Sequence, residues 1–357
     1  MIDLSLLPDG GMSWLDASGP NGSIVLSTRI RLARNLQGFP FSQRAKDADR
    51  TAVLTRVQEA AAASARFPAA VTLRLDQMER PDRQLLHERH LVSKELAGLD
   101  REARPRPGAA LLVQGAVGVM INEEDHLRIH GMRSGFALEE AYVDLESADA
   151  DLGRLLPFAF HPEFGYLTSC PTNAGTGLRA SVLIHLPGLV LTKEIGKVLQ
   201  GLTQVGLTFR GLYGEGSEVV GNFFQLSNQT TLGKSEEELL DHLGKIVRQV
   251  IAYEEQAREL LLHEATTIVA DKVWRAYGTL RYARMLTFDE TMNLLSGVRL
   301  GVGLNFIPGL SVYTLNKLLI FTQPAHLAAL EGRATGDPEL PTVRATHVRR
   351  VLDAEAS

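Results

Sequence analysis

Two arginines stand two positions apart in IVLSTRIRLAR, a run that reads as a β-strand over residues 24–34. Residues two apart in a strand point to the same face, so the guanidinium groups of Arg29 and Arg31 would lie side by side, with Thr28 and Ile30 on the other face. Adjacent guanidiniums repel each other unless an anion lies between them, and the planar fork of arginine suits phosphate oxygens. The pair is a candidate polyphosphate clamp, or it is two unrelated charges on a solvated strand.

A carboxylate candidate follows in the segment INEEDHLRI. In a strand that begins near Glu124, the side chains of Glu124, His126, Arg128 and His130 share a face, and Glu123 points the other way if the pleat already holds there. That arrangement suits a general base next to a phosphate-binding arginine. A local ion pair between Glu124 and Arg128 is the alternative.

The only cysteine of the chain lies in TSCPTNAGTGLRASV. The turn after Cys170 is rich in glycine, so its backbone N–H groups can face an anion, and Arg179 follows. A thiol near cationic side chains has a lowered pKa and can be a thiolate. The alternative for Cys170 is a small buried apolar residue.

A glycine-rich segment, FRGLYGEGSEVVGN, follows at 209–222. Arg210 and Glu215 bracket Tyr213, as in a mobile loop that closes over a ligand; a long hairpin connection is the alternative. LGKSE resembles the end of a P-loop, but that motif needs glycine where Asn228 stands. We therefore reject a P-loop. No H-E-x-x-H, zinc spacing or G-x-S-x-G pattern occurs.

The elements that must position these residues form one α+β pattern up to about residue 255. The sequence predicts strands at 24–34, 71–75, 110–122, 125–132, 166–169, 207–212 and 222–227, and helices at 47–66, 82–98, 135–152 and from Thr192 to about 205. Ser235 and Glu238 form a capping box that starts a long helix. Segments 256–284 and 287–299 and those that follow are helical. We predict an antiparallel sheet with helices packed on it in 1–255, and a helical second domain in 256–357.

Composition excludes several classes of protein. The chain has 357 residues, 45% of them hydrophobic, and a net charge of -5, which argues against general nucleic-acid binding. One cysteine allows neither an internal disulfide nor a cysteine-rich zinc site, so we expect a cytoplasmic protein. The N-terminus lacks the features of a signal peptide, and the longest apolar run is shorter than the roughly 20 residues that span a bilayer.

Four segments together, STRIRLARNL, NEEDHLRI, CPTNAGTGLRASV and RGLYGEG, resemble the phosphagen (guanidino) kinase superfamily over roughly residues 24–254. The stretches RGLYGEGSE and SNQTTLGKSEEE and the helical C-terminal extension resemble its bacterial protein-arginine kinase branch. The resemblance implies a phosphagen-kinase-type catalytic domain, an all-helical domain for dimerisation and regulation, and transfer of the ATP γ-phosphoryl group to arginine side chains of proteins.

The resemblance also implies a site. Glu124 would be the base, Glu215 a second clamp on the substrate guanidinium, and Cys170 a contact to the same group. Mg²⁺ would enter with ATP, without metal ligands from the protein. The residues expected to line the ATP site, with the arginines on the phosphates, are Ser27, Thr28, Arg29, Ile30, Arg31, His90, Arg128, Arg179, Ala180, Ser181, Val182, Leu183, Arg210, Gly211, Leu212, Tyr213 and Gly214.

One departure concerns regulation. Relatives in this branch carry R-D-x-x-R-A near the C-terminus, which binds phosphoarginine as an allosteric signal. The aligned stretch here is LPTVRA, in which Arg344 and Ala345 remain but Leu340 and Pro341 replace the Arg-Asp pair. We expect such feedback to be weak or absent, because the ligand loses a cationic fork and the acid that orients it.

The expected partners also follow from the resemblance. They are proteins with exposed arginines, a second copy of the chain, an activator protein and a Clp-type chaperone-protease in stress response; we expect no membrane and no direct nucleic-acid partner. Only 23 residues precede the first strand, so we expect an open guanidine pocket that admits arginine on a protein surface. The apolar run from Leu294 to Val302 is either core or a homodimer interface. A free-arginine kinase and a non-catalytic adaptor are the alternative functions.

Overall fold

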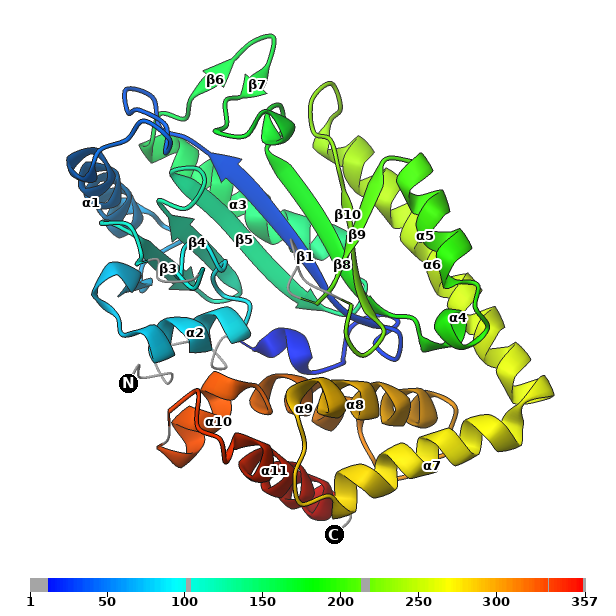
Figure 1. Cartoon of the computed structure of the whole chain (residues 1–357). Helices are drawn as coiled ribbons and strands as arrows, with labels where there is room; N and C mark the ends of the chain where they lie inside the picture. Colours follow the sequence, from blue (N-terminus) through cyan, green and yellow to red (C-terminus); the bar gives the residue numbers. More distant parts are fainter. Residues whose placement is uncertain (1–11, 101–103, 213–218, 333, 356–357) are drawn as a thin grey trace.

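The centre of the molecule is an eight-stranded sheet in which every pair of neighbours is antiparallel. The computed structural model describes residues 12–100, 104–212, 219–332 and 334–355. Across the sheet (Figure 1) the strands lie in the order β2 (Val71–Arg74), β3 (Ala110–Gln114), β4 (Val117–Ile121), β5 (Leu127–Ser134), β1 (Val25–Arg34), β8 (Leu178–His185), β10 (Phe223–Asn228) and β9 (Leu207–Arg210).

One face of the sheet is covered by helices. In Figure 1, α3 crosses behind β5 and β1, and α6 packs on β8 and β10. Side chains such as Ile30, Val182 and Leu145 are fully buried between these layers, so this face holds the main hydrophobic core. The covering helices are α1 (Asp47–Ala63), α3 (Leu138–Leu155), α4 (Pro187–Leu191), α5 (Ile195–Gln204) and α6 (Glu236–Glu264).

Shorter elements surround the other face. The helix α2 (Arg80–Glu88) and the 3₁₀ turn η4 (Leu75–Gln77) lie beside β2 and β3 around a small apolar cluster. The turn η3 (Ser13–Leu15) precedes β1. A two-stranded hairpin, β6 (Phe160–His161) and β7 (Gly165–Tyr166), leads into the turn η5 (Pro171–Asn173) directly after Cys170.

The C-terminal helices form a separate layer below the sheet in Figure 1. They pack around their own apolar cluster, which Phe223 of β10 and Leu26 of β1 also enter. Leu295, Val298 and Leu300 are buried in this cluster, so much of the apolar run 294–302 serves as core within the chain. The helices are α7 (Thr266–Tyr282), α8 (Phe288–Gly303), α9 (Val312–Phe321), α10 (Pro324–Glu331) and α11 (Leu340–Glu355).

The predicted α+β class is confirmed, and several element boundaries are corrected. Segment 110–122 is a tight hairpin rather than one strand, because Gly115 adopts a left-handed φ of 59°. The helix predicted over 82–98 ends at Glu88. Thr192 ends α4 instead of starting α5, whose N-cap is Glu194. Of the strand predicted at 166–169, only Tyr166 is in β7.

The start of the long helix α6 agrees with the prediction. Ser235 Oγ accepts a hydrogen bond from the backbone N–H of Glu238, and the Glu238 carboxylate accepts one from the backbone N–H of Ser235. The helix continues without a break to Glu264, so the domain boundary proposed near residue 255 falls inside it. None of the described helices is long and apolar enough to cross a membrane.

Candidate active site

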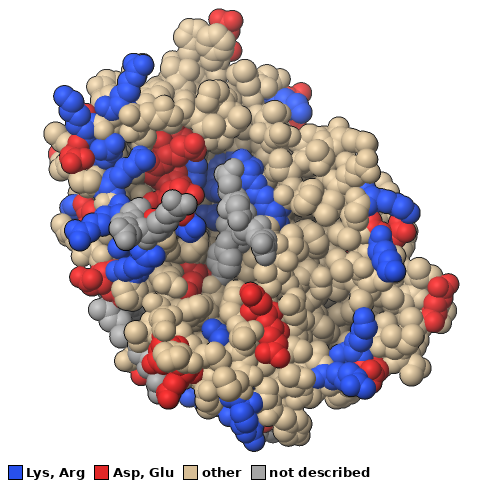
Figure 2. Space-filling view, in the orientation of Figure 1, with Lys and Arg blue, Asp and Glu red and all other residues tan. Residues whose placement is uncertain are grey.

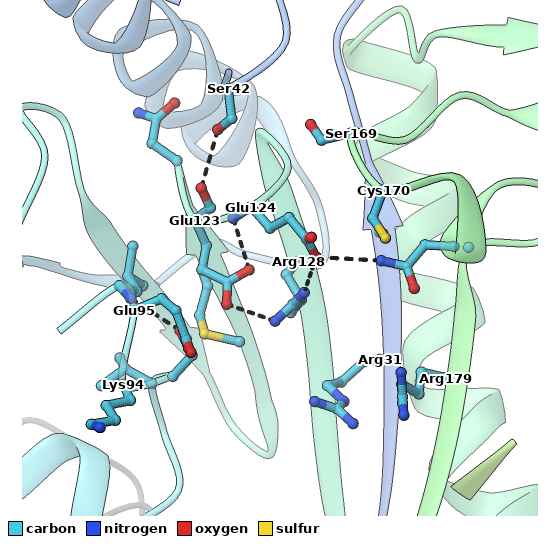
Figure 3. Close-up of a pocket in the computed structure, with 18 of the residues that line it drawn as sticks. Arg31, Ser42, Lys94, Glu95, Glu123, Glu124, Arg128, Ser169, Cys170 and Arg179 are labelled. Carbon is cyan, nitrogen blue, oxygen red and sulfur yellow. Dashed lines mark hydrogen bonds and ion pairs between the residues drawn. The ribbon is translucent and has the colours of Figure 1, made fainter. Parts of the chain in front are cut away.

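A cavity of about 940 Å³ lies over the sheet face that the main core leaves uncovered. Its walls come from β1, β5, β8 and β9, from the segment after α2, and from the turns around Glu124 and Cys170. In the space-filling view, basic and acidic atoms meet near the middle of the same face (Figure 2). The close-up of Figure 3 shows Glu123, Glu124 and Arg128 facing Cys170 across the pocket, with Arg31 and Arg179 below them.

Strand register explains why the basic residues gather. Arg31 lies directly opposite Arg179 of β8 and His130 of β5, and side chains at paired positions of antiparallel strands share a face. Arg29 is two positions from Arg31, so it points to the same face. Five arginines from four strands of the sheet line the cavity: Arg29, Arg31, Arg128, Arg179 and Arg210.

The electrostatics of this cluster favour an anion. Burial, and then the neighbouring Arg128, lower the pKa of Arg29 to about 10. Burial, followed by repulsion from the arginines around it, also lowers the pKa of Arg31 well below its ordinary value. The Nε atoms of Arg29 and Arg31 are buried without a hydrogen-bond partner among the described residues. Buried donors without acceptors cost free energy, and phosphate oxygens placed between them would remove that cost.

Arg128 forms ion pairs with two carboxylates, whereas the sequence led us to expect only that of Glu124. Its Nη1 lies 2.6 Å from Glu123 Oε1, and its Nη2 lies 3.0 Å from Glu124 Oε2. The Glu123 side chain is only 2% exposed, whereas that of Glu124 is 44% exposed. Burial raises the pKa of Glu123, but Arg128 and the backbone N–H of Glu124 outweigh burial, and the pKa is lowered overall. Glu123 is therefore the buried anion that orients Arg128, and Glu124 is the accessible carboxylate.

The expected directions of Glu123 and His126 were wrong. β5 begins only at Leu127, and the segment before it bends after Asn122, which has a left-handed φ of 60°. The strand period therefore does not extend back to Glu123, which turns into the pocket. His126 turns away, where its Nδ1 accepts from the backbone N–H of Leu36 and its Nε2 donates to the Pro40 carbonyl.

The same bend holds the cysteine turn in place. Asp125 is fully buried, and its Oδ1 accepts hydrogen bonds from the Asn35 amide and from the backbone N–H of Ser169, both at 2.6 Å. Sequence reasoning assigned no role to Asp125 or Glu123, although both stand next to Glu124. An acidic run that closes a strand–turn–strand unit was the available signal.

Cys170 lines the pocket as a half-buried thiol, which argues against the small buried apolar residue considered as its alternative. Its Sγ lies 3.0 Å from Thr172 Oγ1. Nearby, the Asn173 amide lies 3.4 Å from Glu124 Oε2, which joins the cysteine turn to the carboxylate turn. Glu124 and Cys170 therefore line the same cavity from adjoining turns.

The other predicted nucleotide residues are divided between the two faces of the sheet. His90 lines the cavity. Burial, and then Arg29, lower the pKa of His90 to about 3. Thr28 points to the opposite face, where its Oγ1 donates to the Gly135 carbonyl. The cavity lining does not include Ser27, Ile30, Ala180, Ser181, Val182, Leu183, Gly211 or Leu212; Tyr213, Gly214 and Glu215 lie outside the described residues.

The residues of the altered C-terminal motif are buried. The Arg344 guanidinium donates from Nε to the Thr322 carbonyl and from Nη1 to the Leu286 carbonyl, at 2.7 and 2.8 Å. Ala345 is fully buried beside it. Arg344 thus holds two loops of the helical layer together. Across the part of the chain that the structure describes, no group of three or more His, Cys, Asp or Glu side chains could hold a metal ion.

Two protein-family models match successive parts of the chain. The model of the "ATP:guanido phosphotransferase, C-terminal catalytic domain" matches residues 52–257, and that of the "Protein-arginine kinase McsB C-terminal domain" matches residues 266–357. A protein-arginine kinase of Symbiobacterium thermophilum is 46% identical over 96% of each chain. One of Desulforamulus reducens is 43% identical over 96% of this chain and 95% of its own.

A solved structure of lombricine kinase superposes with a TM-score of 0.56 and 25% identity, covering 70% of this chain and 71% of that one. The superposition indicates that this chain shares its fold with lombricine kinase over that region.

Proposed function

Because the chain belongs to the ATP:guanido phosphotransferase family, we propose that it is a protein-arginine kinase: it transfers the γ-phosphoryl group of ATP to a guanidino nitrogen of an arginine side chain in another protein. One observation carries the proposal most directly. A single cavity joins five arginines, suited to a polyphosphate, to an accessible carboxylate and a thiol, suited to a guanidinium. The C-terminal match and the named relatives support a protein substrate.

The arginines would hold the phosphates. Arg29, Arg31 and Arg179 lie on the sheet floor, and their fixed positions require no rearrangement when charge shifts toward the leaving group. Mg²⁺, entering with ATP, would neutralise further phosphate charge. Of the predicted nucleotide residues, Thr28 and Ile30 would contribute only through their backbone, since their side chains face the core.

Glu124 would act as the base. A guanidinium is protonated at ordinary pH and has no lone pair with which to attack. As one nitrogen bonds to the γ-phosphorus and the bond to the bridging oxygen breaks, a proton must leave that nitrogen, and the Glu124 carboxylate would accept it. Glu124 is suited to this role because Glu123 already neutralises Arg128 from its buried side. Cys170 would contact the same guanidinium, and Glu215 is proposed as its second carboxylate.

The proposal extends to partners. We propose three partners on the basis of the family resemblance: a second copy of the chain, an activator protein, and a Clp-type protease to which marked proteins are delivered. The division into a catalytic part, 1–255, and a regulatory part, 256–357, is proposed on the same basis. The single, unpaired cysteine is compatible with the cytoplasmic location proposed here. We also propose that phosphoarginine feedback is weak, because Arg344 already donates to two backbone carbonyls.

The test is phosphorylation of an arginine-rich unfolded protein and of free L-arginine with Mg-ATP, read as acid-labile, base-stable phosphate. We expect label on the protein, and a loss of about 1,000-fold in kcat for Glu124→Gln, which keeps shape but cannot take the proton. Glu146→Gln, an exposed change on α3, is the matched control and should keep full activity.

Label only on free arginine would replace the protein-arginine kinase with a free-arginine kinase. Full activity of Glu124→Gln would remove Glu124 as the base. No label on either substrate, with ATP bound and cell extract added, would favour a non-catalytic adaptor.

A further inference from the structure

Four consecutive residues at the end of α2 face two different parts of the molecule. His87 and His90 line the large cavity. Glu88 and Arg89 point instead toward α10, in the C-terminal helical layer (Figure 1). The chain achieves this because α2 ends at Glu88 and His90 adopts a left-handed φ of 61°. A sharp reversal of the backbone therefore joins the pocket wall to the helical layer.

Glu88 holds the first turn of α10. Its carboxylate accepts hydrogen bonds from the backbone N–H of Ala325 at 2.9 Å and of His326 at 3.1 Å. These N–H groups have no acceptor inside the helix, and a negative charge at a helix N-terminus is favourable. Because Glu88 is 4% exposed, water does not replace these contacts.

A histidine completes the contact. The Arg89 Nε–H can only donate, so His326 Nε2, 3.1 Å away, accepts. The ring proton is therefore on Nδ1, which donates to Glu88 Oε2 at 2.9 Å. His326 thus bridges two successive residues of the α2 end, and burial lowers its pKa, which favours the neutral ring that this geometry requires.

A second contact supports the same wall from another helix. The Trp14 ring meets the His90 ring edge-on, with centroids 5.4 Å apart. Trp14 and Leu15 pack against Ile320 of α9, and the Asn316 amide of α9 donates to the Leu15 carbonyl at 2.9 Å. His90 is therefore supported by two helices of the C-terminal layer.

We propose that Glu88 and His326 are positioning residues for nucleotide binding, through which the C-terminal helices hold His87 and His90 in the wall of the ATP pocket. The inference rests on the proposed function, because it assigns ATP to that pocket. It adds a physical link between the helical layer and the site: when the first turn of α10 moves, the α2 end moves with it, and ATP bound against His90 favours the attached arrangement.

The experiment measures Mg-ATP affinity of the full chain by calorimetry, with the melting temperature of each variant. Glu88→Gln keeps the size of the side chain but places an N–H₂ group against the N–H donors of α10. We expect the Kd for Mg-ATP to rise about twentyfold. The control, Glu331→Gln, removes one exposed charge at the other end of α10 and should leave Kd unchanged.

His326→Gln is a milder second variant, because its amide oxygen can still accept from Arg89 and its amide N–H₂ can still donate to Glu88, while the rigid ring that joins the two contacts is lost. We expect a rise of about fivefold in Kd, with kcat at saturating ATP close to that of the native protein. A purely structural role would lower the melting temperature and leave the Kd of the folded protein unchanged.

An unchanged Kd in both folded variants would overturn the inference. A native chain that fails to bind Mg-ATP would overturn the proposed function, and the inference with it. The Kd of the native chain thus separates the two failures.

Discussion

Buried arginines occur in both layers of this protein, and their partners differ. In the helical layer and where it meets the sheet, Arg344 donates to two carbonyls, and Arg258 donates to Glu254 at 2.7 Å. In the pocket, the Nε–H groups of Arg29 and Arg31 have no hydrogen-bond acceptor among the described residues, and other arginines lie around Arg31. A buried arginine whose N–H groups donate to acceptors within the protein stabilises the fold. A buried arginine with unsatisfied N–H groups gains hydrogen bonds when an anion binds from solution. The comparison therefore distinguishes Arg29 and Arg31 from Arg258 and Arg344 without reference to relatives.

The largest expected effect is on a pocket arginine. Arg31→Gln should lower kcat/KM for phosphoryl transfer about 1,000-fold, since a positioned arginine stabilises transition-state charge. Because burial and repulsion already lower the pKa of Arg31, removing the charge should leave the melting temperature equal or higher. Steady-state kinetics and thermal melts of the same sample test this, and a clear loss of stability would contradict the comparison.

The opposite result is expected for a buried arginine that has an acceptor within the protein. Arg258→Met removes the partner of Glu254, whose carboxylate would then remain buried with only the N–H groups of Gly188 and Leu189. We expect a loss of about 3 kcal/mol in the free energy of unfolding. Urea unfolding measures the loss. Activity per folded molecule, measured well below the melting temperature, should be native, and a selective loss of kcat would refute the structural assignment.

Acid should destabilise the pocket through His90. The pKa of His90 is about 3 in the folded protein, against an ordinary value of 6.5. Below pH 6.5, His90 is therefore protonated in the unfolded chain but stays neutral in the folded chain. This contribution to stability is complete above pH 6.5 and declines as the pH falls toward 3. At pH 5 this effect lowers the free energy of unfolding by about 2 kcal/mol. Urea unfolding at pH 7.5 and pH 5 should show a smaller difference for His90→Gln, and an equal difference would exclude His90 as the cause.

The smallest effect is expected for the thiol. Cys170 lines the pocket as a half-buried side chain, and its Sγ lies 3.0 Å from Thr172 Oγ1. Cys170→Ser keeps a polar atom in this position, so we expect a loss of about fivefold in kcat/KM, which corresponds to roughly 1 kcal/mol. A loss as large as that of Arg31→Gln would make the thiolate essential and would place Cys170 with the catalytic groups.

Much of the pocket was predictable because strand geometry is local. A period of two residues indicated that Arg29 and Arg31 share a face, and the capping box located the start of α6. The α+β class followed from the same patterns. Local patterns failed where the backbone leaves its regular conformation, as at Asn122 and His90, both of which have positive φ.

The sequence by itself determined the chemical groups of this protein: which strands carry arginines, where the acidic turn and the thiol stand, and which family they resemble. Only the tertiary structure decided how these groups are used. It turned Glu123 into the pocket, attached the cysteine turn to Asp125, and committed Arg344 and Glu88 to the helical layer. The physical reason is that hydrogen bonds and ion pairs between distant segments compete for the same polar atoms, and the outcome depends on which segments the fold brings together.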